Sequence, residues 1–317
     1  MLLTALLYAL FASLFGLSKE TLNHCEPFFL IGSRMAFAGL LLLAHQWVYN
    51  REAFRFSPSH LFYLFFLGFL SIYLTNVAEI WAIQHMASSK ACLIYSLSPF
   101  LSAAVAFLIL GERLTPKKWL GLLVGFMGLI PVFIIQAPTE TPMHEFIRIS
   151  WAECSMLVAV LGSVFGWIIL KKLISEYKDS PLMANGIGMT LGGTMALLHS
   201  YAAGESWNPL PISNLQPFLQ NTVLMCLISN IVCYNLYGYL LKRYSATFMS
   251  LAGLITPFFA AFFGWYFLNE TITWHYFTAV SIFGVGLLLF YQEELRMNKK
   301  VEHIVDTALP LSAEVTQ

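Results

Sequence analysis

The composition of this 317-residue chain excludes an ordinary water-soluble protein. Hydrophobic residues make up 58% of the sequence and charged residues 11%, whereas a typical soluble domain is about 25% charged. The formal net charge is zero and no basic cluster with interleaved aromatic residues occurs, so we expect no nucleic-acid partner. The five cysteines are scattered without the short spacing of a zinc site, and we expect no metal or other cofactor.

Continuous apolar runs of about 20 residues predict an all-α integral membrane protein. A transmembrane β-barrel would instead show alternating segments of about ten residues. In chain order we predict ten membrane-spanning helices in two sets of five. The first set covers residues 1–18, 27–49, 60–84, 88–110 and 117–135, and the second covers 151–174, 181–203, 216–241, 246–268 and 274–292.

Lysine and arginine distribute unevenly between alternate loops, and basic residues accumulate on the cytoplasmic side of a membrane. With the amino terminus inside, 13 of the 17 basic residues lie on the cytoplasmic side and only Lys19, Lys90 and Arg148 lie outside, with Arg34 inside a span. We therefore predict that both termini are cytoplasmic. Residues 136–150 then form an external loop, and 293–317 form a cytoplasmic polar tail.

The two halves of the sequence resemble each other. The segment PFLSAAVAFLILGERLT at 99–115 aligns with PFFAAFFGWYFLNETIT at 257–273 at an offset of 158 residues. Pro27 and Gly39 likewise correspond to Pro181 and Gly193. The matches predict a first repeat at 1–135 and a second at 151–292. Because five is odd, the second repeat enters the membrane from the opposite face, which gives an inverted pair.

These features together resemble the drug/metabolite transporter superfamily, in its ten-helix EamA-type branch. The residues that carry the resemblance end the fourth and ninth spans, and Asn269 stands where glycine is more usual; they are Pro99, Gly111, Glu112, Pro257, Asn269 and Glu270. We expect a structural role for this motif at the membrane edge. The resemblance implies a secondary-active or facilitative carrier of a small metabolite in a bacterial inner membrane, working by alternating access through a central cavity.

Two charged residues are predicted to lie deep in the membrane. Arg34 lies in the second span and Glu79 at a similar depth in the third. Charges at such depths are usually paired, whether they have a structural or a functional role. The pair could therefore be a structural ion pair, or it could bind the substrate.

Polar residues also form a stripe on the third span and another on the eighth, where inverted repeats place their binding sites. At the 158-residue offset Asn76 matches Tyr234 and Glu79 matches Tyr237. Hydrogen bonding between packed helices is the alternative to a cavity lining. The stripes consist of Tyr73, Asn76 and Glu79 on the third span, and of Asn230, Tyr234 and Tyr237 on the eighth.

Three further residues are candidates for substrate contact. Tyr95 and Ser98 precede Pro99, which is expected to kink the fourth span and free a carbonyl group. Trp167 lies away from the membrane interface and could stack on a planar or cationic substrate. A packing kink without substrate contact is the alternative for Tyr95 and Ser98, and core packing is the alternative for Trp167.

A carrier for an amino acid, or for an amino-acid-bearing metabolite such as an S-adenosylmethionine-like compound, is the leading hypothesis. Arg34 and Glu79 could bind the carboxylate and the amine of a zwitterion. A proton gradient or a counter-substrate would drive transport, and the oligomeric state stays open. An intramembrane enzyme is the rival, but HEFIR at 144–148 lacks the second histidine of a zinc-protease motif. A membrane scaffold would leave the duplicated polar stripes unexplained.

Overall fold

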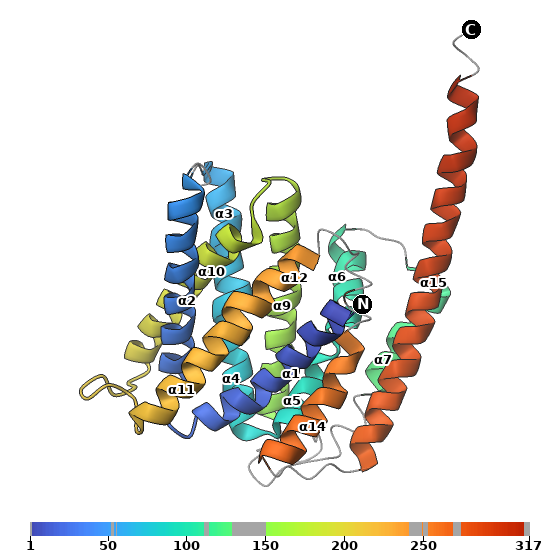
Figure 1. The fold of residues 1–317 in the computed structure, drawn as a ribbon. Coiled ribbons are helices and arrows are strands. Elements are labelled where there is room, and N and C mark those ends of the chain that lie inside the picture. Colours follow the sequence, from blue (N-terminus) through green and yellow to red (C-terminus); the bar gives the residue numbers. More distant parts are fainter. Residues whose placement is uncertain are drawn as a thin grey trace.

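A computed structural model shows a bundle of helices (Figure 1). It describes residues 2–51, 54, 56–110, 114–128, 150–240, 249, 253–268 and 274–313. Within these residues, six helices are long and apolar enough to cross a membrane. They are Leu2–Thr21, Pro27–Tyr49, Pro58–His85, Trp151–Ser175, Leu215–Leu240 and Trp274–Glu293. The predicted all-helical membrane fold is confirmed.

The helices follow the predicted spans closely, with two interruptions that the sequence did not indicate. The first part of the chain forms α1 (Leu2–Thr21), α2 (Pro27–Tyr49), α3 (Pro58–Phe66), the π-helix η2 (Leu67–Leu74), α4 (Thr75–His85), α5 (Ser88–Tyr95), α6 (Ser98–Leu110) and α7 (Pro116–Met127). The second part forms α9 (Trp151–Ser175), α10 (Pro181–Ala202), α11 (Leu215–Met225), the π-helix η3 (Cys226–Cys233), α12 (Tyr234–Leu240), the short 3₁₀ helix η4 (Gly253–Ile255), α14 (Thr256–Leu268) and α15 (Trp274–Ala313).

Capping residues fix where several helices begin. Proline occupies the first helical position of α2, α3, α7 and α10, where its missing N–H group costs nothing. Ser57, Thr115 and Ser180 each accept a hydrogen bond from a backbone N–H of the first turn. Ser150 and Glu153 form a reciprocal capping box that starts α9.

Helices α2 and α10 cross with their backbones in close contact. A Cβ atom on Gly39 would lie 2.5 Å from the Thr190 backbone nitrogen, and one on Gly193 would overlap the backbone of Ala36. Gly39 and Gly193 are equivalent in the two halves, and so are Ala36 and Thr190, at an offset of 154. The two contacts are therefore symmetry equivalents, as a two-fold axis between the helices requires.

The same contacts show that α2 and α10 run in opposite directions. Gly32 meets Leu197 near one end of the crossing, whereas Gly186 meets Leu43 near the other. As the residue number rises along α2, it falls along α10. Equivalent helices of the two halves thus run antiparallel, which is the arrangement expected of inverted repeats.

The π-helices occupy equivalent places in the two halves, but at an offset of 159 and not 158. Asn76 donates to the Ile72 carbonyl group over 2.8 Å, just after η2. Asn235 donates to the Ile231 carbonyl group over 2.9 Å, just after η3. Asn76 therefore corresponds to Asn235, and the predicted match with Tyr234 is wrong by one residue.

Each half packs its first helix into the other half. Helix α9 lies against α4, η2, α5 and α6, whereas α1 lies against α14, α11 and η3. The bundle thus contains two mixed groups of helices, joined through the crossing of α2 and α10. Helices α7 and α15 pack on each other at one side of the bundle, where Gly121 and Gly125 face Gly286 (Figure 1).

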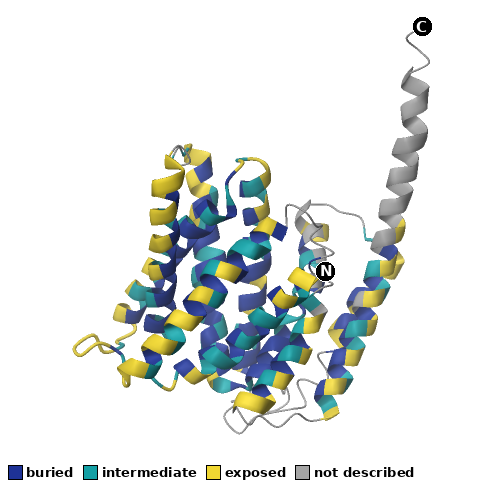
Figure 2. Cartoon of the chain, viewed as in Figure 1, coloured by how far each residue is buried: buried dark blue, intermediate teal, exposed yellow. Residues whose placement is uncertain are grey.

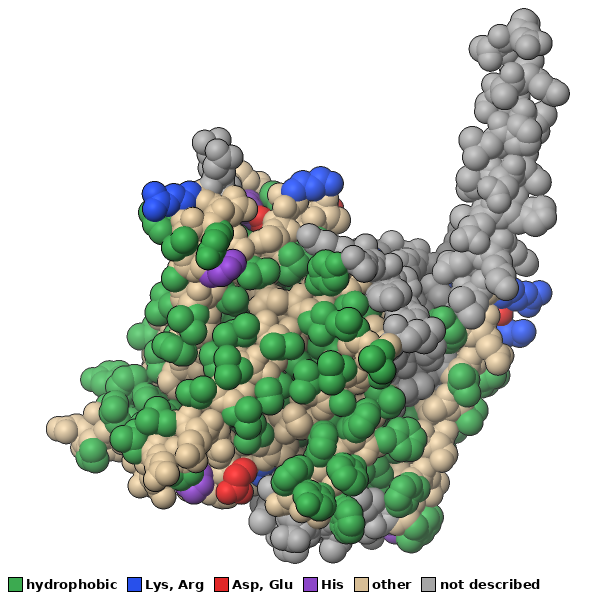
Figure 3. Space-filling model, viewed as in Figure 1, with side chains coloured by type: hydrophobic (Ala, Val, Ile, Leu, Met, Phe, Trp, Pro, Cys, Tyr) green, Lys and Arg blue, Asp and Glu red, His purple; other side chains and the backbone are tan. Residues whose placement is uncertain are grey.

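Surface chemistry agrees with a membrane setting. Exposed residues cover the outside of the bundle and buried ones fill its middle (Figure 2). Hydrophobic side chains spread across the middle of the visible face, whereas the lysine and arginine side chains gather toward its upper end (Figure 3). Apolar side chains that would face lipid include Phe37, Leu108 and Phe262.

The last helix and the motif prolines lie differently from what the predicted spans imply. Helix α15 continues to Ala313, so the predicted boundary at residue 293 does not end the last helix. Pro99 and Pro257 are each the second residue of a helix, α6 and α14. The motif residues Gly111, Glu112, Asn269 and Glu270 lie outside the described residues, as does most of the predicted loop at 136–150.

Candidate functional site

Seven of the ten predicted site residues converge near the middle of the bundle. They come from five predicted spans, and we call this group the central cluster. Arg34, Asn76 and Tyr234 are buried, while the other four are partly exposed. The central cluster consists of Arg34, Asn76, Glu79, Tyr95, Trp167, Tyr234 and Tyr237.

Arg34 is held by neutral neighbours. Its Nη2 donates to Asn76 Oδ1 over 3.1 Å, and its Nη1 donates to the Met225 sulfur over 3.3 Å. Its Nε has no hydrogen-bond partner among the described residues. Arg34 is 5% exposed and its Nε is buried, so an unused donor there is costly unless a ligand accepts from it.

Glu79 lies in the same cluster but forms no close ion pair with Arg34. Longer-range electrostatic interactions connect its carboxylate to Arg34, Tyr95 and Tyr234. No described side chain forms a hydrogen bond or a close ion pair with it. The structure thus shows no direct pair between Arg34 and Glu79, and substrate binding by either residue stays a prediction.

Aromatic rings surround these charges. The Trp167 ring stacks on Tyr237 at a centroid distance of 4.0 Å and lies 5.7 Å from Tyr234. Phe11 and Phe15 of α1 extend the wall, by contacts with Tyr234 and Tyr95. Rings from α1, α5, α9 and α12 thus meet at one place, and both halves contribute.

Tyr73 and Asn230 have hydrogen-bond partners outside the central cluster. Tyr73 pairs its hydroxyl with His199 on α10 over 3.0 Å, and Asn230 donates to the Met35 sulfur over 2.7 Å. Both residues lie inside π-helices, where each turn holds more residues than the 3.6 assumed in the prediction. Their contact with substrate stays a prediction. Ser98 begins α6, just after the break that follows Tyr95.

Asn185 and Asn235 form a second polar contact that the sequence reading missed. Asn185 Nδ2 donates to Asn235 Oδ1 over 3.1 Å. Asn76 accepts from Arg34 in a similar way in the first half, although Arg34 and Asn185 do not occupy equivalent positions on α2 and α10. An offset of 159 in the alignment would have revealed Asn235.

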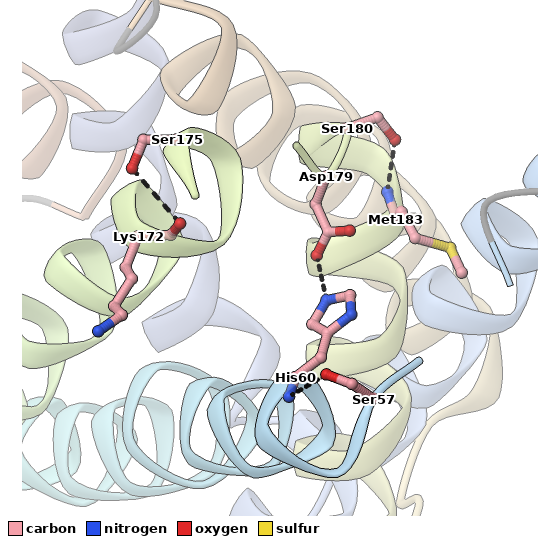
Figure 4. Close-up of polar contacts among 7 residues, drawn as sticks. All are labelled: Ser57, His60, Lys172, Ser175, Asp179, Ser180 and Met183. Carbon is pink, nitrogen blue, oxygen red and sulfur yellow. Dashed lines mark hydrogen bonds and ion pairs between the residues drawn. The ribbon is translucent and has the colours of Figure 1, made fainter. Parts of the chain in front are cut away.

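Two ion pairs join the halves at opposite ends of α9. Lys90 and Glu153 approach to 2.8 Å at its start, with 5% and 0% of these residues exposed. His60 and Asp179 approach to 2.7 Å beyond its other end (Figure 4). Tyr177 stacks on the His60 ring there. Burial raises the pKa of the Asp179 carboxyl group, and the hydrogen bond from His60 opposes that rise. Helix α9 has 25 residues, which separates its two ends by roughly 37 Å.

Two surface hollows lie apart from the central cluster. One, of about 300 Å³, is lined by Trp81, His85, Trp151 and Ala152. The other, of about 620 Å³, lies between α6 and α7 and is lined mainly by apolar side chains such as Trp119 and Phe126. The described residues that line them include no lysine, arginine, aspartate or glutamate. Among the described residues, no three histidine, cysteine, aspartate or glutamate side chains are placed to hold a metal ion.

Comparison with known proteins gives one consistent assignment. The EamA-like transporter family matches residues 1–134 and again residues 150–292. An S-adenosylmethionine/S-adenosylhomocysteine transporter of Chlamydia muridarum is 36% identical over 288 residues, covering 90% of each chain. Its counterpart in Chlamydia trachomatis serovar L2 is 35% identical, covering 90% of this chain and 87% of its own.

More distant proteins agree. The uncharacterized inner membrane transporter YedA of Escherichia coli is 23% identical, covering 90% of this chain and 86% of its own. One solved crystal structure, only 14% identical, shares the fold with a TM-score of 0.63 over 91% of this chain and 96% of its own. The named relatives are transporters and not enzymes. The chain therefore belongs to the EamA-like transporter family, and it is a multi-pass membrane transporter.

Proposed function

We propose that this protein carries S-adenosylmethionine and S-adenosylhomocysteine, as the chlamydial relatives are named to do. One observation supports the central cluster as the binding site: Arg34 and Glu79 lie together inside the membrane without pairing with each other. Charges so placed are costly unless a ligand complements them. An amino-acid-bearing metabolite supplies a carboxylate for Arg34 and a positive charge for Glu79.

Other residues of the central cluster suit the nucleobase and the carboxylate of such a molecule. The stacked pair of Trp167 and Tyr237 offers ring faces to a flat nucleobase. Asn76 holds the guanidinium of Arg34 in place, which prepares it to bind a carboxylate with two parallel hydrogen bonds. Rigid placement of this kind lowers the entropy cost of binding.

Transport would proceed by alternating access. The two mixed groups of helices, one around α9 and the other around α1, would rock about the crossing of α2 and α10 and open the buried cluster to either side. The two repeats would be inverted five-helix units in a bacterial inner membrane, with both termini cytoplasmic. Because the relatives are named for a substrate and its demethylated product, we propose exchange of one for the other as the driving process.

Substitution of Arg34 tests this assignment. Arg34→Gln is expected to reduce the initial uptake of labelled S-adenosylmethionine into proteoliposomes by about 10- to 100-fold, since a charged hydrogen bond to the carboxylate is lost. Arg51→Gln is the matched control, because Arg51 is exposed and its contacts within the described part of the chain are with the Trp47 carbonyl group and ring. Wild-type uptake by an Arg34→Gln protein that retains its melting temperature would contradict the assignment.

A further inference from the structure

Two tyrosines of the central cluster, Tyr95 and Tyr234, interact electrostatically with the carboxylate of Glu79. Their hydroxyl groups are turned toward polar side chains of the protein. Further rings pack on these two: Phe15 lies 5.9 Å from Tyr95, and Trp167 lies 5.7 Å from Tyr234, between ring centroids. The described neighbours of the carboxylate therefore include aromatic rings whose hydroxyl groups are already engaged.

This environment suits one kind of cation better than another. A primary ammonium group has three N–H donors and needs several acceptors to replace its water. A sulfonium group has no N–H donor, is weakly hydrated, and is attracted by ring faces, as other onium cations are. A single carboxylate among aromatic rings thus matches a sulfonium cation more closely than an ammonium.

We propose that Glu79, with Tyr95 and Tyr234, forms a sulfonium subsite that distinguishes S-adenosylmethionine from S-adenosylhomocysteine. This inference rests on the proposed function and adds the residue that sets its specificity. The two compounds differ by one methyl group and one positive charge at sulfur. Arg34 would bind the carboxylate that both compounds have, whereas Glu79 would bind the charge that only one has.

The difference between the two compounds also serves transport. A carboxylate next to the sulfur makes the cationic compound the tighter ligand of the cluster. S-adenosylhomocysteine lacks the sulfonium charge and binds through Arg34 and the aromatic rings, so it leaves more readily. A carrier with such a subsite favours loading of the methylated compound when both are present on one side of the membrane.

Binding competition tests the inference. Labelled S-adenosylhomocysteine is bound to the purified full-length protein and displaced by either unlabelled compound. Glu79→Gln is expected to weaken displacement by S-adenosylmethionine about 10- to 100-fold, because a charged contact is lost, and to leave displacement by S-adenosylhomocysteine unchanged. Glu79→Asp keeps the charge and is expected to keep the preference. Glu20→Gln, at the exposed end of α1, is the matched control.

The outcomes separate this inference from the proposed function. Retained binding of labelled S-adenosylhomocysteine shows that the Glu79→Gln protein is folded. If Glu79→Gln weakens both compounds equally, Glu79 binds the shared amine and the sulfonium subsite is wrong. If it weakens neither, Glu79 does not contact the ligand. If the wild-type protein binds neither compound, the proposed function itself fails.

Discussion

Replacing Lys90 with methionine is expected to destabilise the folded protein by about 3–5 kcal/mol, because it leaves a buried carboxylate without its partner. Glu153 is fully buried, and its Oε1 lies 2.8 Å from Lys90 Nζ. Its other oxygen accepts from the Ser150 backbone N–H over 2.7 Å and caps α9. The expected result is a large drop in the melting temperature of the detergent-purified protein.

Two variants separate the lost ion pair from a general effect of removing charge. Lys117→Met removes a lysine whose side chain is 66% exposed and 3.9 Å from Glu293, and should change the melting temperature little. Adding Glu153→Gln to Lys90→Met should recover much of the loss, because a neutral glutamine keeps the cap without a buried charge. A Lys90→Met protein that melts like the wild type would show that the pair contributes nothing to stability.

Gly193→Leu is expected to prevent correct packing of the bundle. A Cβ atom at Gly193 would overlap the backbone of Ala36, and a backbone cannot move aside as a flexible side chain can. Helices α2 and α10 would have to separate along their whole crossing. Overpacking costs typically 1–3 kcal/mol, and we expect about 3 kcal/mol or more here, since small residues set the approach of membrane helices.

Size-exclusion chromatography and thermal unfolding check this prediction. Gly284→Leu is the matched control, because a Cβ atom there would meet nothing within 4 Å. We expect Gly193→Leu to lose the monodisperse peak and Gly284→Leu to keep it. Gly39→Leu should behave like Gly193→Leu, since the two glycines have equivalent places. Normal unfolding of Gly193→Leu would show that the close crossing of α2 and α10 is wrong.

Hydropathy located the helices because membrane burial imposes a simple rule on sequence. The predicted span 27–49 coincides with α2, and 151–174 differs from α9 by one residue. A run of apolar residues that ends at proline, serine or charge leaves little choice in where a membrane helix begins. Of the ten predicted spans, six appear as single long apolar helices in the described part of the chain.

The π-helices were not predictable in this way. Hydropathy does not depend on whether a backbone N–H bonds four or five residues back. Tyr73 and Asn230 were placed by a period of 3.6 that fails inside η2 and η3. The alignment of the two halves failed because one offset does not fit the whole repeat: Pro99 and Pro257 differ by 158, whereas Asn76 and Asn235 differ by 159. The second half therefore has one residue fewer between its asparagine and its proline than the first half has.

The inter-half ion pairs were missed because their partners are distant in sequence. His60 and Asp179 are 119 residues apart, and nothing in the local pattern of either residue indicates the other. Arg34 and Glu79 were identified because a charge inside an apolar run is visible without knowing its neighbours. The sequence thus indicated which charges mattered at the centre, but it did not indicate that Asn76 rather than Glu79 holds Arg34.

Exchange across a membrane tests the central claim most directly. Proteoliposomes containing the full-length protein are loaded with unlabelled S-adenosylhomocysteine and diluted into labelled S-adenosylmethionine. We expect transient accumulation of label above its external concentration, and none in liposomes with Arg34→Gln or without protein. Equal label in loaded, unloaded and protein-free liposomes would contradict it.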